Sequence, residues 1–157
     1  MLQVGQNIPD SLAPDQFGKE RRLYGLLGAK GGVIYFYPKD NTPGCTLEAQ
    51  DFQAHGGDFQ AMGYAIVGIS KDSVPSHEKF CAKYQLGFTL LSDQDGRLCE
   101  GFGVWQEKKN YGKTYMGIVR ATFVVDAHGL IQQVYPKVKT KGHAEQVLQD
   151  LRRRTTE

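Results

Sequence analysis

Short runs of β-branched and aromatic residues alternate with helical patterns along the chain, and this alternation restricts the fold more than any other feature. Four runs are typical of strands, at residues 32–37, 64–70, 88–91 and 121–126. Turn residues separate the last of these from another apolar run at 130–135, which predicts an antiparallel hairpin. Helical patterns occupy the remaining segments, at 43–55, 75–85 and 142–154. We therefore predict an α/β fold with a central mixed sheet, helices on both faces and the terminal hairpin supplying antiparallel edge strands.

Length and charge restrict the class of protein. A chain of 157 residues is long enough for one domain with a substantial core. Its net charge of +2 argues against a dedicated nucleic-acid binder, since such proteins carry a strong basic excess. No stretch approaches the roughly 20 apolar residues that span a bilayer, and the N-terminus lacks the features of a signal peptide. We expect a single domain over 1–157, monomeric and cytoplasmic, without nucleic-acid or membrane partners.

The chain has three cysteines, Cys45, Cys81 and Cys99. An odd count at wide spacing is not the framework of a disulfide-stapled secreted domain. There is also no C-x-x-C pair and no histidine pair at the spacing of zinc ligands. Each cysteine is therefore either a buried apolar residue or a reactive thiol, and its surroundings decide which.

Cys45 lies at a strand–loop–helix junction. Thr42 suits the N-cap and Pro43 the first helical position, so that Cys45 becomes the third helical residue. The helix is expected to run to His55, where the glycine pair at 56–57 ends it. Backbone N–H groups of the first turn lack partners and favour an anion, and with a nearby cation such a site lowers a thiol pKa by about 1–5 units. The alternative is an inert, half-buried cysteine.

The residues around this cysteine resemble the active-site signature of the peroxiredoxins. Pro38-x-x-x-Thr42-x-x-Cys45 matches that signature, and residues 36–48 are similar to the bacterioferritin comigratory protein, or peroxiredoxin Q, subfamily. Residues 115–123 match a second block of this subfamily, and the resemblance covers nearly the whole chain. It implies a thioredoxin-like fold and thiol-dependent reduction of hydrogen peroxide and organic hydroperoxides, with no metal, flavin or haem.

The resemblance also implies residue roles. Cys45 is the peroxidatic nucleophile, Thr42 holds the peroxide oxygens, and Pro38 shields the sulfur from water. Arg120 lies beside the sulfur, where its permanent charge stabilises the thiolate and the leaving oxygen. Glu48, one helical turn after the cysteine, orients the guanidinium through a bidentate pair. The alternatives are a surface charge for Arg120 and a solvated helix residue for Glu48.

A second thiol is needed to condense with the sulfenic acid that peroxide leaves on Cys45. By resemblance, the commonest partner in the subfamily lies five residues on, where this chain has Gln50. Another arrangement places it in the next helix, where Cys81 stands 36 positions after Cys45. We expect Cys81 to resolve the sulfenic acid, Cys99 to be a bystander, and a thioredoxin-type dithiol protein to restore both thiols. A disulfide needs Cα atoms within about 7 Å, and two helices packed on one sheet rarely bring two residues that close. We therefore expect the start of the Cys45 helix, the Cys81 helix, or both to unwind locally.

Other interpretations stay open. Cys81 is a packed apolar residue if the enzyme uses one cysteine only, and a redox sensor or holdase-like protein would use the same disulfide as a switch. A general disulfide oxidoreductase would need a cysteine where Glu48 stands. His77 is expected to be an exposed helix residue, and the lysines at 108, 109 and 113 are expected to belong to a flexible surface loop.

Overall fold

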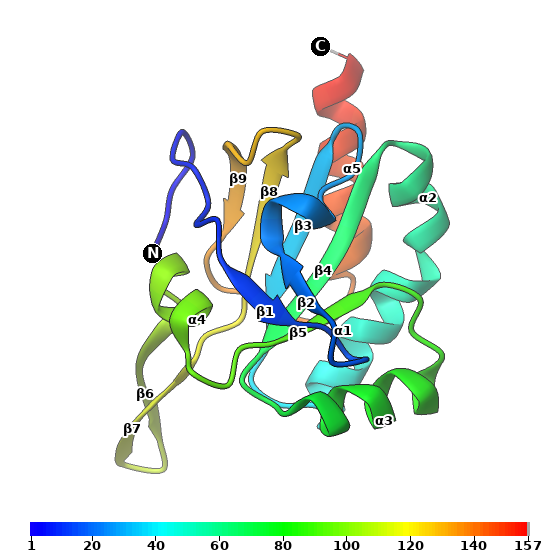
Figure 1. Ribbon diagram of the computed structural model, residues 1–157. Helices are drawn as coiled ribbons and strands as arrows, with labels where there is room; N and C mark the ends of the chain where they lie inside the picture. Colours follow the sequence, from blue (N-terminus) through cyan, green and yellow to red (C-terminus); the bar gives the residue numbers. More distant parts are fainter. Residues whose placement is uncertain (157) are drawn as a thin grey trace.

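One five-stranded sheet forms the centre of the computed structural model, which describes residues 1–156 (Figure 1). Its order is β5–β4–β3–β8–β9, with β3 parallel to β4, β4 parallel to β5, and the other neighbours antiparallel. The strands are β3 (Gly31–Phe36), β4 (Tyr64–Ser70), β5 (Thr89–Ser92), β8 (Ala121–Asp126) and β9 (Ile131–Tyr135). The predicted mixed sheet is confirmed. Of the terminal hairpin only β9 is an edge strand, because β8 pairs with β3.

Alternating side chains of β3 divide the core into two parts. Tyr35 and its neighbours at alternate positions join one core, whereas Ile34 and Phe36 join the other. Helices α1 (Pro43–Ala54), α2 (Gly56–Ala61), α3 (Val74–Tyr84) and α5 (His143–Thr156) contribute to the first core. The second core is completed by β1 (Leu12–Pro14), the 3-10 helix η1 (Leu23–Leu26) and α4 (Arg97–Phe102), and β1 pairs with β2 (Glu20–Arg22). Helices therefore lie on both faces, as predicted.

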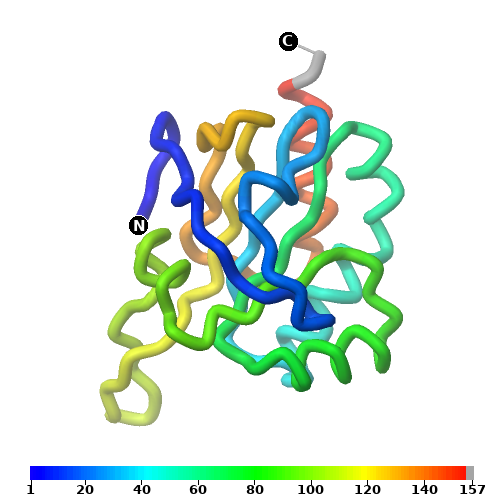
Figure 2. The backbone as a smooth tube through the Cα atoms, in the orientation of Figure 1, coloured from blue at the N-terminus to red at the C-terminus, as the bar shows by residue number. Residues whose placement is uncertain are grey.

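A two-stranded hairpin projects from this body at the lower left of Figure 1, and the backbone trace in Figure 2 shows the same projection. It consists of β6 (Trp105–Asn110) and β7 (Lys113–Ile118). Its turn residues, Tyr111 and Gly112, both have positive φ, at 51° and 76°, as a two-residue hairpin turn requires. The expectation of a flexible surface loop here is wrong, because the lysines belong to paired strands.

Helix α1 begins as predicted, with Thr42 at the N-cap and Cys45 as the third helical residue. It ends at Ala54, and the glycines at 56–57 open α2 rather than a loop. Within the described part of the chain, no helix combines the length and the apolar character that crossing a membrane demands.

Candidate active site

Strand pairing brings Arg120 to Cys45 although 75 positions separate them in the sequence. In the antiparallel pair of β3 and β8, Phe36 lies opposite Ala121, so Arg120 stands level with the chain that leaves β3 toward α1. Its Nη2 donates a hydrogen bond to Cys45 Sγ at 3.1 Å. A guanidinium does not lose its proton in proteins, so this donor is always available to a thiolate.

Glu48 binds the same guanidinium from α1. Arg120 Nη1 donates to Glu48 Oε1 at 3.1 Å, while the buried Oε2 has no hydrogen-bond partner among the described residues. The expectation of a bidentate pair is therefore wrong, because only one carboxylate oxygen contacts the guanidinium. Burial raises the pKa of Glu48 to about 7, and the charge and hydrogen bond of Arg120 oppose that rise. The carboxyl thus exchanges its proton close to neutral pH.

Gly44 is a site residue that the sequence analysis missed. A Cβ at this position would stand 2.8 Å from Arg120 Nη2, well inside ordinary contact. The absence of a side chain therefore leaves the space that the guanidinium occupies beside the sulfur. The signal was present in the Thr-Pro-Gly-Cys string of residues 42–45, but spacing alone does not say which distant side chain enters that space.

The Thr42 hydroxyl donates to the Lys39 carbonyl at 2.8 Å. It makes no helix-capping hydrogen bond although Thr42 stands at the N-cap position. Because its proton is used in this way, the hydroxyl oxygen is left to accept a hydrogen bond from a second molecule. Pro38 is half-buried and directly follows the buried Tyr37 at the end of β3. The shielding role of Pro38 stays a prediction.

Lys108 provides a second cation at this site, which the sequence analysis placed in a surface loop. Its Nζ donates to the Ile118 carbonyl at 2.9 Å, across the base of the β6–β7 hairpin. Burial, followed by repulsion from Arg120, lowers the pKa of Lys108, and the charge of Cys45 acts in the opposite direction. The hairpin therefore carries a positive charge within electrostatic range of the sulfur.

The other two cysteines lie on opposite faces of the sheet. Cys81 belongs to α3 and to the same core as Cys45, whereas Cys99 belongs to α4 and to the second core. All three thiols are free and buried. Burial, with the charge of Asp40 as a second cause, raises the pKa of Cys81 to about 12. Burial also raises the pKa of Cys99, and Asp93 adds to the effect.

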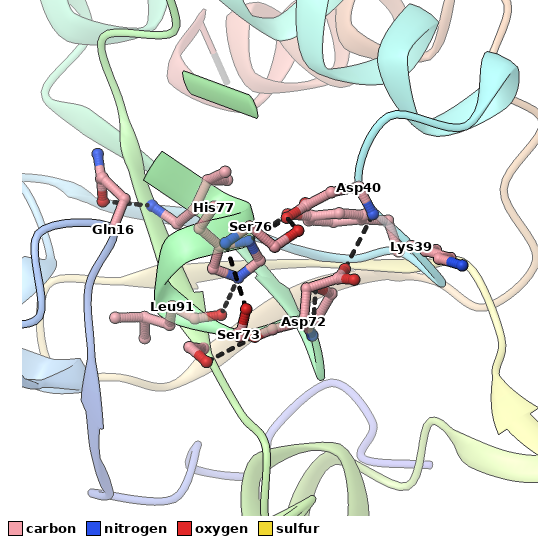
Figure 3. A network of polar contacts seen from close by, with 12 residues as sticks. Gln16, Lys39, Asp40, Asp72, Ser73, Ser76, His77 and Leu91 are labelled. Atoms are coloured by element: carbon pink, nitrogen blue, oxygen red, sulfur yellow. Dashed lines mark hydrogen bonds and ion pairs between the residues drawn. The ribbon is translucent and has the colours of Figure 1, made fainter. Parts of the chain in front are cut away.

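His77 is fully buried, so the expectation of an exposed helix histidine is wrong. Its ring lies between Asp40 and Leu91 (Figure 3). Ligand atoms of Asp40, Asp72 and His77 lie within 4.8 Å of one another, the spacing of a metal site. The Asp40 and Asp72 oxygens nevertheless accept hydrogen bonds from neighbouring groups, including the Asp40 backbone N–H and the Ser70 hydroxyl. The group is therefore a hydrogen-bond network.

Known proteins resemble this chain over nearly its full length. Residues 4–134 match the model of the AhpC/TSA family. The chain is 46% identical to the putative peroxiredoxin bcp of Coxiella burnetii, over 94% of this chain and 97% of that protein. It is 44% identical to peroxiredoxin Bcp of Bacillus subtilis, over 96% of both. A solved structure of the bacterioferritin comigratory protein of Xanthomonas campestris superposes with a TM-score of 0.88 at 41% identity, covering 97% of this chain and 99% of that one.

Proposed function

The chain belongs to the AhpC/TSA family, in its Bcp and peroxiredoxin Q branch, and on that premise we propose a thiol peroxidase in which Cys45 reduces hydrogen peroxide and organic hydroperoxides. In this proposal Cys81 resolves the oxidised sulfur and a thioredoxin-type dithiol protein restores both thiols. The observation that carries it is the 3.1 Å hydrogen bond from Arg120 to Cys45 Sγ in the first turn of α1.

The first step transfers one oxygen to sulfur. The Cys45 thiolate attacks the terminal peroxide oxygen, the O–O bond breaks, and the other oxygen takes a proton from solvent and leaves as water or an alcohol. The sulfur becomes a sulfenic acid. Arg120 stabilises the thiolate and the charge that develops on the leaving oxygen, while Thr42 Oγ1 accepts a hydrogen bond from the peroxide hydroxyl. Lys108 adds a second positive charge near the same atoms.

The second step joins two thiols. The Cys81 sulfur attacks the sulfenic sulfur of Cys45, an S–S bond forms, and the S–O bond breaks to release water with the proton of the Cys81 thiol. In the folded state Cys81 is a weak nucleophile, since burial raises its pKa to about 12. Local opening of α3, of the start of α1, or of both therefore has to expose it. A dithiol reductant then exchanges with the disulfide and regenerates both cysteines.

The test of the peroxidase assignment is Cys45→Ser. This variant should fold normally and consume no hydrogen peroxide or alkyl hydroperoxide when a thioredoxin-type reductant is supplied. Peroxide consumption at the wild-type rate would refute the assignment of the nucleophile. The monomeric state and the cytoplasmic location remain predictions from the sequence.

The burial of Cys81 also fits a one-cysteine enzyme, because this residue is only 7% exposed and packs within the core. In that case an external thiol attacks the sulfenic acid directly, and Cys81→Ser changes nothing in turnover. A redox sensor is distinguished by stoichiometry: it is oxidised once and then binds a partner, whereas a peroxidase consumes many equivalents of peroxide.

A further inference from the structure

A buried pair of polar side chains joins the two parts of the chain that carry Cys45 and Cys81. Asp40 lies in the loop between β3 and α1, five positions before Cys45, and is 6% exposed. His77 lies in α3, one helical turn before Cys81, and has no exposed surface. His77 Nδ1 and Asp40 Oδ2 are 2.6 Å apart. The contact spans 37 positions and is visible at the centre of Figure 3.

Neighbouring groups complete the hydrogen bonds of this pair. The Tyr37 hydroxyl donates to Asp40 Oδ1 at 2.6 Å, and the Ser76 hydroxyl donates to Asp40 Oδ2 at 2.8 Å. On the other side of the ring, His77 Nε2 lies 3.0 Å from the Leu91 carbonyl oxygen. A carbonyl oxygen can only accept, so Nε2 is the donor to Leu91, and a second proton held between Nδ1 and Oδ2 completes the contact with Asp40. The imidazole therefore contacts both the loop before Cys45 and strand β5.

This arrangement favours one position of α3. A buried polar group is costly when its partner is missing, and here Asp40 belongs to the loop while its partners Ser76 and His77 belong to α3. The Asp40 carboxylate and the His77 ring satisfy each other only while α3 is docked on the loop. Moving α3 far enough to bring Cys81 to Cys45 therefore has to break this contact, unless the loop moves with it.

We propose that Asp40 and His77 are positioning residues that form a latch between the Cys45 loop and the Cys81 helix. The latch keeps α3 docked while Cys45 reacts with peroxide, and its release limits the rate at which the Cys45–Cys81 disulfide forms. This inference rests on the proposed function. The chemistry gated by the latch is the condensation of the Cys45 sulfenic acid with the Cys81 thiol, which releases one water and needs no further oxidant.

Two substitutions weaken the latch from opposite sides. Asp40→Asn removes the charge of the carboxylate but leaves an amide that can still hydrogen-bond to the ring, and His77→Gln keeps an amide donor for the Leu91 carbonyl while losing the contact with Asp40. Each should speed disulfide formation by about tenfold, which corresponds to about 1.4 kcal/mol in favour of the open state. The docked state stays dominant, so oxidation of Cys45 by peroxide should keep its wild-type rate. Disulfide formation should be faster in both variants. Because only Asp40→Asn removes the negative charge near Cys81, acceleration in His77→Gln shows that loss of the contact is sufficient.

Rapid-quench mass spectrometry follows the two steps separately, since it resolves the sulfenic acid from the disulfide. The double variant tests for a shared contact: its disulfide rate should not exceed that of either single variant.

Faster disulfide formation should also protect Cys45 from further oxidation to sulfinic acid at high peroxide. Hydrogen exchange of the α3 amides in the reduced protein should be faster in both variants.

Leu98→Ala serves as the matched control, because it opens a cavity in the core on the opposite face of the sheet without touching α3. It should lower global stability and leave the disulfide rate unchanged. An equal acceleration in Leu98→Ala would overturn the latch, as would unchanged or slower disulfide formation in both Asp40→Asn and His77→Gln. Should those two variants not fold, Ser76→Ala removes one hydrogen bond from Asp40 and should give a smaller acceleration in the same direction.

The experiment separates failure of the latch from failure of the proposed function. If the proposed function is wrong, the wild-type protein forms no sulfenic acid at Cys45 and no Cys45–Cys81 disulfide. If only the latch is wrong, the wild-type protein performs both steps and the latch variants do not accelerate the second.

Discussion

Cys45 and Cys81 are buried in one core, but the charges that face them are opposite. Cys45 accepts a hydrogen bond from Arg120 and is 1% exposed, whereas the more exposed Cys81, at 7%, faces the Asp40 carboxylate. Burial is the larger cause of the raised pKa of Cys81, and the charge of Asp40 adds to it. Cys45 differs in the cationic donor beside its sulfur, because a cation favours a thiolate and an anion opposes it.

Cys99 extends the comparison to the other face of the sheet. It is fully buried and lies beside Asp93, which resembles the surroundings of Cys81. It differs in position, because the central sheet separates Cys99 from Cys45. Sheet topology rather than local chemistry distinguishes the candidate resolving thiol from the bystander.

The largest effect is expected from Arg120→Ala, which removes the cation from Cys45. The second-order rate constant for oxidation by peroxide should fall by about 100-fold or more. Alkylation of Cys45 should slow as well, because the variant lacks the guanidinium that binds the sulfur. Stopped-flow kinetics and the rate of iodoacetamide labelling measure the two effects. Arg120→Lys keeps the charge without the fork and should recover part of the rate. A rate within about threefold of wild type in Arg120→Ala would contradict the role of the guanidinium.

Cys81→Ser and Cys99→Ser contrast the two faces of the sheet. Cys81→Ser should keep the first oxidation at its normal rate but lose turnover with a thioredoxin-type reductant, because no intramolecular disulfide forms. Cys99→Ser should retain both. Peroxide consumption with a coupled reductase assay distinguishes them. If Cys99→Ser loses recycling and Cys81→Ser keeps it, the assignment of the two thiols is reversed.

Gly44→Ala tests whether the guanidinium needs the space beside the sulfur. A Cβ 2.8 Å from Arg120 Nη2 must displace it, and a displacement of this kind should slow oxidation of Cys45 by about tenfold. Gly57→Ala is the control, since a Cβ there meets no atom within 4 Å. Equal peroxide rates in the two variants would show that the position of the guanidinium does not depend on residue 44.

The last effect, expected from Glu48→Gln, is on stability rather than rate, and it depends on pH. Burial in the folded protein raises the pKa of Glu48 from 4.5 to about 7, so ionising this carboxyl destabilises the fold. The stability that the protonated carboxyl contributes is fully present below pH 4.5 and is lost as pH rises through about 7. Relative to Glu48→Gln, the wild-type protein should therefore lose about 3 kcal/mol of unfolding free energy across this range. Urea unfolding at several pH values measures it, with Glu100→Gln, an exposed glutamate, as control. A constant difference between wild type and Glu48→Gln would show that Glu48 does not titrate in this range.

The local part of the site was predictable from sequence because its signals are local. Thr42 and Pro43 stand at the N-cap and at the first helical position, as predicted, and this places Cys45 in the first turn, although the Thr42 hydroxyl donates to the Lys39 carbonyl and does not cap the helix. The contact of Arg120 with the sulfur was expected only through the family resemblance, since nothing in the intervening 75 positions determines it. Strand register supplies that contact, and single-sequence patterns do not determine register.

The missed features depend on tertiary partners. The burial of His77 needs the Asp40 carboxylate, 37 positions away, and a helix pattern gives no sign of that partner. The β6–β7 hairpin is largely exposed, its apolar residues do not alternate with polar ones, and its turn runs through Tyr111 and Gly112 at positive φ. It therefore lacks both the apolar alternation and the Asn-Gly turn by which a hairpin is predicted from sequence. Glu48 meets Arg120 through one oxygen because of side-chain geometry, which spacing along a helix does not fix.

Peptide mapping of the wild-type protein after one equivalent of hydrogen peroxide tests the contrast between the thiols most directly. We expect a single cross-linked species joining the peptides of Cys45 and Cys81, with Cys99 still available to alkylation after denaturation. A cross-link between Cys45 and Cys99, or a Cys45 sulfenic acid that persists while Cys81 stays reduced, would contradict it.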